Sequence, residues 1–372
     1  EYVEAEEGNV VGILEKWVRP FNLNQAPLWR IGLVKLEKDR HILFMDMHHI
    51  ISDGVSMTKM FKEIKALYEG ETLEKLNVQY KEYAVWQQSW LETGALQKQR
   101  DYWLEQLSGE IPVLGIPTDY ARPAVKTYTG DQLRFKVDEA LSHKIKQLAS
   151  DTGSTLYMFL LAAYNTLLYK YSGQEDIIVG TPIAGRTHPE THDMLGMFVN
   201  TLALRNFPQG NKTFKAFLEE IKRETLTAYD HQDYPFEELV EQVVVQRDLS
   251  RSPLFDTMFA LQNMAFSIGG MGDVQYRSYE LPYKVAKFDL TWTAVQRDAD
   301  IHFVIEYNTD LYKPETIERM SRHFVHILES VIEDAEQRLV DIDMLSTAEK
   351  EQLLIQFNDT KVAYPKDKTI QE

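Results

Sequence analysis

Residues 40–67 constrain the fold most, because they combine the patterns of a strand, a turn and a helix in one short segment. Residues 40–47 (RHILFMDM) are apolar at most positions, which predicts a strand buried on both faces. The Ser-Asp-Gly sequence at 52–54 is typical of a turn. Apolar side chains then recur at helical spacing, at Met57, Met60, Phe61, Ile64 and Leu67. We therefore expect a strand–turn–helix unit whose strand runs to 48 and ends in histidines.

His48 and His49 stand at the end of this predicted strand. Because side chains alternate along a strand, His49 is expected on the face of Met47, and His48 on the face of Phe44. Imidazole transfers protons near neutral pH, and the carboxylate of Asp53, four residues further on, is suited to orient it. A histidine at a strand end is also commonly structural. His and Asp can bind a metal, although no cysteine or spaced third histidine supports that here. The residues alone leave these alternatives open.

The segment 48–54 (HHIISDG) resembles the HHxxxDG signature of the condensation domains of nonribosomal peptide synthetases. Further segments resemble motifs of the same family and follow in the family's order: 80–86 (YKEYAVW), 195–201 (LGMFVNT), 231–237 (HQDYPFE) and 247–254 (RDLSRSPL). Within 52–56 and 231–234 the resemblance is greatest to the LCL-like subclass, which joins an L-configured donor to an L-configured acceptor. Starter domains that add a fatty acyl group are similar at these positions.

Composition narrows the class of protein further. A chain of 372 residues is long enough for two lobes. A formal net charge of −17 argues against a nucleic-acid partner, and the lack of cysteine rules out disulfides, cysteine nucleophiles and cysteine-ligated metals. We find no apolar run of membrane-spanning length and no signal peptide, since the first residues are acidic. We therefore expect a cytoplasmic protein without a membrane partner.

The periodicity of the remaining chain predicts a mixture of helices and strands. Helices are expected over 8–18, 78–107 with a break near Gly94, 139–149, 155–171 (buried), 214–231, 235–245, 314–333 and from 347. Strands are expected over 30–36, 41–48, 132–137, 176–182, 198–204, 255–262, 274–279, 288–295 and 301–307. The proline-rich stretch 109–126 is interpreted as the passage between lobes. We divide the chain into an N-terminal lobe at 1–122, a C-terminal lobe at 123–344 and a linker at 345–372.

The resemblance implies an α/β (α+β) fold in which two lobes similar to chloramphenicol acetyltransferase form a V-shaped pseudo-dimer with a central tunnel. It implies no cofactor or metal bound by the domain itself, because substrates arrive on the 4'-phosphopantetheine arms of upstream and downstream peptidyl carrier proteins. The amine of a carrier-bound aminoacyl thioester would attack a peptidyl or acyl thioester, and 345–372 would lead into an adenylation domain on the same chain. Two motifs of the family nearer the N-terminus have no counterpart, so part of the first lobe is expected to be missing.

The resemblance also assigns roles to individual residues. His49 and Gly54 are the catalytic candidates: His49 would position the attacking amine or accept its proton, and Gly54 would let a backbone N–H approach the oxyanion. Asp53 would pair with an arginine, for which Arg186 is the candidate, and His48 would support the site by packing or hydrogen bonding.

Other residues are given roles with an alternative beside each. Ser56 and Asn200 are candidates for the tunnel wall, although a strand asparagine that bonds neighbouring backbone explains Asn200 equally well. Structural roles are expected for the charged or ring-bearing residues of the later motifs, namely His231, Asp233, Arg247 and Arg251.

Three other functions remain in competition with condensation. An epimerisation domain shares the histidine motif but removes and returns an α-proton, and it usually precedes another condensation domain rather than an adenylation domain. A non-catalytic recruitment module on the same fold usually loses the histidines. A generic acyltransferase that uses coenzyme A would not require the ordered set of motifs.

Overall fold

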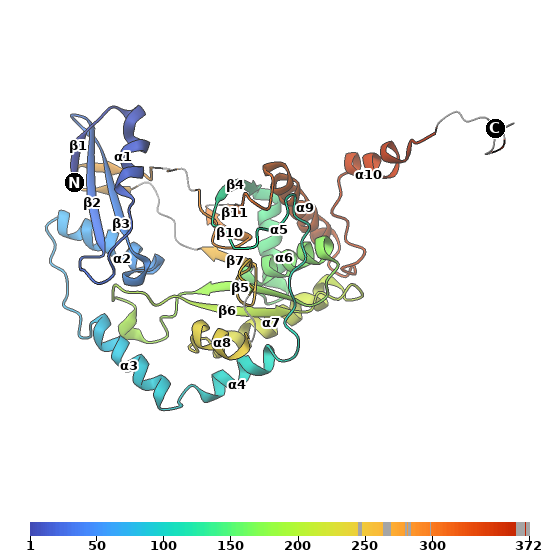
Figure 1. Ribbon diagram of the computed structural model, residues 1–372, viewed down its shortest axis with the longest axis horizontal. Helices are drawn as coiled ribbons and strands as arrows, with labels where there is room; N and C mark the ends of the chain where they lie inside the picture. Colours follow the sequence, from blue (N-terminus) through green and yellow to red (C-terminus); the bar gives the residue numbers. More distant parts are fainter. Residues whose placement is uncertain are drawn as a thin grey trace.

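The chain forms two bodies of unequal size, each built on its own β-sheet (Figure 1). The computed structural model describes residues 1–244, 248–262, 269–279, 281, 284–297, 299–361 and 369. The smaller body holds a three-stranded sheet and the larger one a six-stranded sheet. Two consecutive helices, α3 (Tyr80–Glu92) and α4 (Gln97–Gln106), run along one side of the molecule from the smaller body to the larger.

The smaller sheet has the order β1-β2-β3, with β1 (Tyr2–Glu4) parallel to β2 (Trp29–Glu37) and β2 antiparallel to β3 (Arg40–Met47). Helix α1 (Val10–Trp17), which follows the short 3₁₀ helix η1 (Glu7–Asn9), covers one face. Its apolar stripe forms a small core with Val34 of the sheet. After β3 the chain passes through a 3₁₀ turn, η2 (His49–Ile51), into α2 (Gly54–Tyr68), so the predicted strand–turn–helix unit is confirmed.

The prediction that residues 40–47 are buried on both faces is wrong. Ile42 and Phe44 pack against the α1 side, but Leu43 on the other face is 49% exposed. A three-stranded sheet with helix α1 on one face buries one set of alternating side chains. The apolar run in the sequence therefore reflects one buried face and one apolar face that no described element covers fully.

The larger sheet has the order β4-β11-β10-β7-β5-β6. The pairs β10–β7 and β5–β7 are parallel and the other neighbours are antiparallel. Its strands are β4 (Gly130–Val137), β5 (Ile177–Ile183), β6 (Asn200–Asn206), β7 (Thr257–Gln262), β10 (Leu290–Arg297) and β11 (Asp300–Asn308). Its helices are α5 (Glu139–Asp151), α6 (Leu156–Ser172), α7 (Phe214–Asp230), α8 (Phe236–Val243) and α9 (Pro314–Glu333), with a 3₁₀ turn η3 (Pro189–Thr191).

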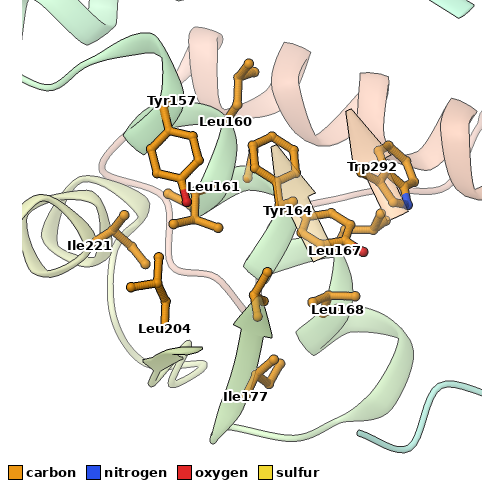
Figure 2. Close-up of a cluster of buried hydrophobic side chains, with 14 of the residues drawn as sticks. Tyr157, Leu160, Leu161, Tyr164, Leu167, Leu168, Ile177, Leu204, Ile221 and Trp292 are labelled. Carbon is orange, nitrogen blue, oxygen red and sulfur yellow. The ribbon is translucent and has the colours of Figure 1, made fainter. Parts of the chain in front are cut away.

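Helix α6 lies at the centre of the larger core. Its residues 157–168 are all buried, which confirms the predicted buried helix. Figure 2 shows Tyr164, Leu167 and Leu168 of this helix beside Ile177 of β5 and Trp292 of β10. Such close packing holds α6 firmly against the larger sheet.

Most predicted elements are present within one to three residues of the predicted ends. Gly94 takes a φ of +72°, which explains the break between α3 and α4. The predicted strand at 274–279 is shorter, β9 (Val274–Tyr276), and it pairs with β8 (Gly269–Met271) in a hairpin that the sequence did not predict. Val245, the predicted end of α8, lies outside the described residues.

The connector at 109–126 packs on the larger body. Asp119 receives hydrogen bonds from Lys313 and Thr316 at the start of α9, and Trp103 of α4 belongs to the larger core. Helix α4 and the connector therefore pack on the larger body, while the lobe boundaries at 122 and 344 stay predictions. The linker begins with α10 (Thr347–Leu354) and η4 (Gln356–Asn358). The first turn of α10 contacts α9 through Glu349 and His323, and beyond it the linker extends away from the larger body in Figure 1. Residues 362–368 and 370–372 of the linker lie outside the described residues.

Candidate active site

The paired histidines stand on the turn that joins β3 to α2. β3 ends at Met47, and His49 belongs to η2, so the expectation that the strand runs to 48 and fixes the faces of both histidines is wrong. The turn ends at Asp53, the N-cap of α2, whose Oδ1 accepts the N–H of Ser56 at 2.7 Å. Asp at this position accepts a hydrogen bond from one of the amides of the first helical turn that have no intrahelical partner, which explains why the helix begins here.

His48 holds the shape of the turn. Its Nδ1 accepts the N–H of Ile50 at 3.1 Å, so the side chain caps η2. A backbone amide can only donate, so this Nδ1 carries no proton and the neutral ring carries its proton on Nε2. The backbone N–H of His48 donates to the carbonyl of Leu28 at 3.0 Å, and its ring meets the ring of Phe21 edge-on.

His49 is exposed at the start of η2. In the part of the chain that the structure describes, its imidazole has no hydrogen-bond or ion-pair partner, unlike that of His48. The ring can therefore contact a ligand without giving up a hydrogen bond to another described residue. His49 stands four residues before Asp53 in the chain, and Asp53 belongs to a joint between the two bodies.

Arg186 and Asp53 form the ion pair that the sequence predicts. Nη2 of Arg186 lies 3.1 Å from Oδ1 and 3.3 Å from Oδ2 of Asp53, and the two side chains are 5% and 0% exposed. Nη1 of Arg186 also donates to the carbonyl of Met194 at 2.9 Å, and the guanidinium lies 4.1 Å from the ring centroid of Phe198. This arginine therefore connects the turn of the smaller body with the segment between β5 and β6 of the larger one.

Ser56 completes the joint from the first turn of α2. Its Oγ donates to the carbonyl of Gly196 at 2.8 Å and accepts from the N–H of the same residue at 3.0 Å and from Arg186 at 2.8 Å. Asp53 Oδ2 accepts the N–H of Phe198 at 3.0 Å. We define the joint as Asp53, Ser56, Arg186, Gly196 and Phe198. Its hydrogen bonds are buried or partly buried, and those made by Asp53 and Arg186 are charge-assisted, which makes them strong.

Two further contacts flank the joint. The hydroxyl of Tyr80 in α3 donates to the carbonyl of Met197 at 2.8 Å, and burial raises the pKa of Tyr80, which keeps it a donor. Lys59 of α2 forms an ion pair with Asp193 at 2.7 Å, on the surface. Neither contact is predicted from the sequence. The motif at 80–86 was the available signal for Tyr80, while nothing local marks Lys59 or Asp193.

Gly54 is the first residue of α2. The amides of a first helical turn have no intrahelical acceptor and lie at the positive end of the helix dipole. The N–H of Gly54 is one of these amides, next to the turn that carries His49. An oxyanion near this amide would be stabilised, and the role of Gly54 stays a prediction.

The tunnel candidates are both held by hydrogen bonds. Ser56 is buried, and the bonds of its hydroxyl within the joint leave it no open surface. Asn200 lies in β6, where Nδ2 donates to the carbonyls of Gln232 and Tyr234 and Oδ1 accepts the N–H of Phe236. These bonds match the alternative interpretation of Asn200 as a strand residue that bonds neighbouring backbone.

Residues of the later motifs make internal contacts. The His231 ring stacks on Tyr102 with centroids 4.1 Å apart, and its Nδ1 lies 2.8 Å from the carbonyl of Thr227. Arg251 pairs with Asp256 in the larger body. In a separate contact, Asp233 accepts from Gln99 and Thr187. The fourth residue expected to be structural, Arg247, lies outside the described residues.

The described part of the chain contains neither a cluster of metal-ligand residues nor a membrane-spanning helix. Its His, Cys, Asp and Glu residues form no group of three or more that could hold a metal ion. None of its helices combines the length and the apolar composition that crossing a bilayer requires.

Comparisons with known proteins identify the family. Residues 3–354 match the family model of the condensation domain, and the chain belongs to this family. It is 50% identical over 373 residues to gramicidin S synthase 2 of Brevibacillus brevis, covering 100% of this chain and 8% of that protein. It is 51% identical over 360 residues to tyrocidine synthase 3 of Brevibacillus parabrevis, covering 97% of this chain and 6% of that protein. The chain therefore spans less than a tenth of the length of each of these two relatives.

A solved structure supports the fold independently. The chain matches a four-domain nonribosomal peptide synthetase bound to AMP and glycine with a TM-score of 0.82 and 24% identity, covering 94% of this chain and 28% of that one. The fold is thus the α/β fold of condensation domains, a pseudo-dimer similar to chloramphenicol acetyltransferase, which confirms the fold that the motifs imply.

Proposed function

We propose that this domain forms an amide bond between two carrier-bound substrates. The amine nitrogen of an aminoacyl thioester attacks the carbonyl carbon of a peptidyl or acyl thioester. The new C–N bond forms first and gives a tetrahedral intermediate, whose collapse breaks the C–S bond. The donor's thiol leaves with the proton that the amine gives up, and the lengthened peptide remains on the acceptor arm. Both arms are 4'-phosphopantetheine groups of peptidyl carrier proteins, and an adenylation domain follows on the same chain.

The imidazole of His49 is the observation that carries this proposal. It has no partner among the residues that the structure describes, and it stands four residues before Asp53 of the joint. A ring held on a fixed turn can orient the attacking amine or take its proton as the C–N bond forms. The backbone N–H of Gly54 then stabilises the oxyanion of the tetrahedral intermediate. His48 and the joint hold this turn without contacting the substrates, and a tunnel between the bodies brings the two arms to His49.

The finer features of the proposal rest on the sequence motifs. The residues at 52–56 and 231–234 support an L-configured donor and an L-configured acceptor. Membership of a family found within gramicidin S and tyrocidine synthases supports carrier proteins and an adenylation domain as partners.

The test uses two carrier proteins, one loaded with a donor and one with an L-aminoacyl acceptor. We expect a dipeptidyl thioester on the acceptor carrier, detected by mass spectrometry of the released arm, and no product when either carrier is omitted. Conversion of the donor residue to its D-isomer without transfer would instead identify an epimerisation domain. A domain that binds both carriers and changes neither would be a recruitment module.

A further inference from the structure

The loop at residues 18–28 packs against His48, and Arg30 holds the loop in this position. Arg30 lies in β2 directly opposite Asp46 of β3. Its Nη1 donates to Oδ2 of Asp46 at 2.9 Å and to the carbonyl of Trp17 at 2.9 Å, while Nη2 donates to the carbonyl of Pro20 at 3.2 Å. The side chains of Arg30 and Asp46 are only 16% and 18% exposed, so this ion pair is largely shielded from water.

The face of the same guanidinium holds an aromatic ring. The guanidinium carbon of Arg30 lies 3.7 Å from the ring centroid of Phe21, a cation–π contact. The Phe21 ring in turn meets the ring of His48 edge-on, with centroids 6.2 Å apart and planes at 90°. Arg30 therefore sets the position of Phe21, and Phe21 packs against one side of the His48 imidazole.

The other end of the loop reaches His48 through the backbone. The carbonyl of Leu28 accepts the N–H of His48 at 3.0 Å. The loop thus touches this histidine at its backbone and at its ring, and the ring caps the turn that carries His49 through Ile50. Because Nδ1 of His48 accepts the N–H of Ile50, this nitrogen carries no proton.

We propose that Arg30 is a positioning residue that acts through Phe21 and His48 to fix the direction of the His49 imidazole. This inference rests on the proposed function only in its catalytic consequence, since the effect on His48 is measurable without substrates. The ion pair with Asp46 alone would stabilise the sheet. The contacts to Trp17, Pro20 and the Phe21 ring direct the guanidinium toward the histidine turn.

The first readout is the tautomer of His48 in the ¹⁵N-histidine-labelled chain. In the wild type the His48 signals should report an unprotonated Nδ1 and a protonated Nε2, because Nδ1 accepts the N–H of Ile50. Arg30→Met and Phe21→Leu should shift these signals toward a mixture of the two tautomers, whereas Phe21→Tyr keeps the ring and should keep the wild-type pattern. Arg40→Met is the matched control, because Arg40 lies at the far end of the same sheet, where it pairs with Glu7.

The second readout is the rate of dipeptide formation at saturating carrier concentrations. A displaced imidazole lowers kcat rather than raising KM, and we expect a loss of about tenfold to a hundredfold in Arg30→Met and Phe21→Leu. Arg40→Met and Phe21→Tyr should retain the wild-type kcat. Circular dichroism of each variant confirms that it is folded, and Phe21→Leu, which keeps the Arg30–Asp46 pair, tests the proposal even if Arg30→Met does not fold.

Unchanged His48 signals and an unchanged kcat in both Arg30→Met and Phe21→Leu would overturn the proposal. An equal loss of kcat in Arg40→Met would also overturn it, because the effect would then belong to the sheet as a whole. If the wild type forms no dipeptide while the His48 signals still respond to Arg30→Met, the proposed function fails and the link from Arg30 to His48 stands.

Discussion

Arg186 and Asp53, 133 residues apart in the chain, meet with 3.1 Å between Nη2 and Oδ1 in a site from which water is almost excluded. This pair joins the turn that carries the histidines to the segment between β5 and β6. The turn that carries His48 and His49 thus belongs structurally to both bodies, although its residues all come from the smaller one.

Replacing Arg186 by Met should destabilise the fold strongly. The carboxylate of Asp53 would stay buried without its counter-charge, which costs about 3–5 kcal/mol in comparable buried pairs. Lys59→Met is the control, since the surface pair of Lys59 with Asp193 should contribute less than about 1 kcal/mol. Urea denaturation of both variants measures the difference, and equal losses would contradict the role given to the joint.

Gly196→Ala should also destabilise the joint, for a steric reason. A Cβ at this position would stand 2.1 Å from a ring atom of Tyr80, whose hydroxyl is fixed on Met197. Overpacking of this kind costs about 1–3 kcal/mol. Gly12→Ala in α1 is the matched control with the opposite sign: a Cβ there meets nothing within 4 Å, and Ala stabilises a helix interior by about 1 kcal/mol over Gly.

Thermal unfolding of the two glycine variants gives the comparison directly. We expect a lower Tm for Gly196→Ala and a higher one for Gly12→Ala. Adding Tyr80→Ala to Gly196→Ala should relieve the clash, so the pair should lose less stability than the sum of the two single variants. A strictly additive pair would show that the ring of Tyr80 does not limit Gly196.

The linker helix α10 is held to the larger body by a buried histidine. Nδ1 of His323 lies 2.8 Å from the hydroxyl of Tyr171, and its Nε2 lies 3.1 Å from Oε1 of Glu349 in α10. Burial lowers the pKa of His323 below its ordinary 6.5 and outweighs Glu349, whose hydrogen bond and negative charge act in the opposite direction. Burial also acts on Glu349, but hydrogen bonds from Ser346 and His323 outweigh it and bring the pKa of Glu349 to about 2.

Acid should therefore loosen the linker. The unfolded chain protonates His323 at a higher pH than the folded one, so stability is lost as the pH falls below 6.5 through the folded pKa. The contribution of Glu349 is complete above pH 4.5 and is lost as the pH falls toward about 2. Amide hydrogen exchange at 347–358 should accelerate first as the pH falls below 6.5, relative to α6, after correction for the intrinsic rate.

The variant His323→Gln keeps a donor for Glu349 but cannot titrate. It should flatten the pH dependence of exchange in α10 between pH 6.5 and 4.5. His326→Gln, on a more exposed part of the same helix, is the control and should keep the wild-type profile. A wild-type profile in both variants would show that another group controls the attachment of the linker.

Local patterns were sufficient to predict most elements of this fold. The apolar run of α6 and the Gly94 break are properties of the local sequence, and both are present. The exposed face of β3 was not predictable, because Leu43 looks the same in sequence whether or not another element covers it. The β8–β9 hairpin escaped prediction because β8 holds two glycines in three residues.

The site was predictable where a motif named its residues and not where distant segments meet. The turn at 48–54 and the pairing of Asp53 with Arg186 followed from the motif and its resemblance. The bonds between Ser56 and Gly196 join residues 140 positions apart, and no local pattern encodes such a partner. The same holds for Phe21, whose contact with His48 depends on how the loop at 18–28 folds back.

The most direct test of the account is the single-turnover rate of dipeptidyl thioester formation by His49→Ala. General-base or positioning catalysis by a histidine is worth about a hundredfold to ten-thousandfold, so the variant should lose product formation by that factor. His41→Ala, which removes an exposed histidine from β3, should keep the wild-type rate. An unchanged rate in folded His49→Ala would contradict the account.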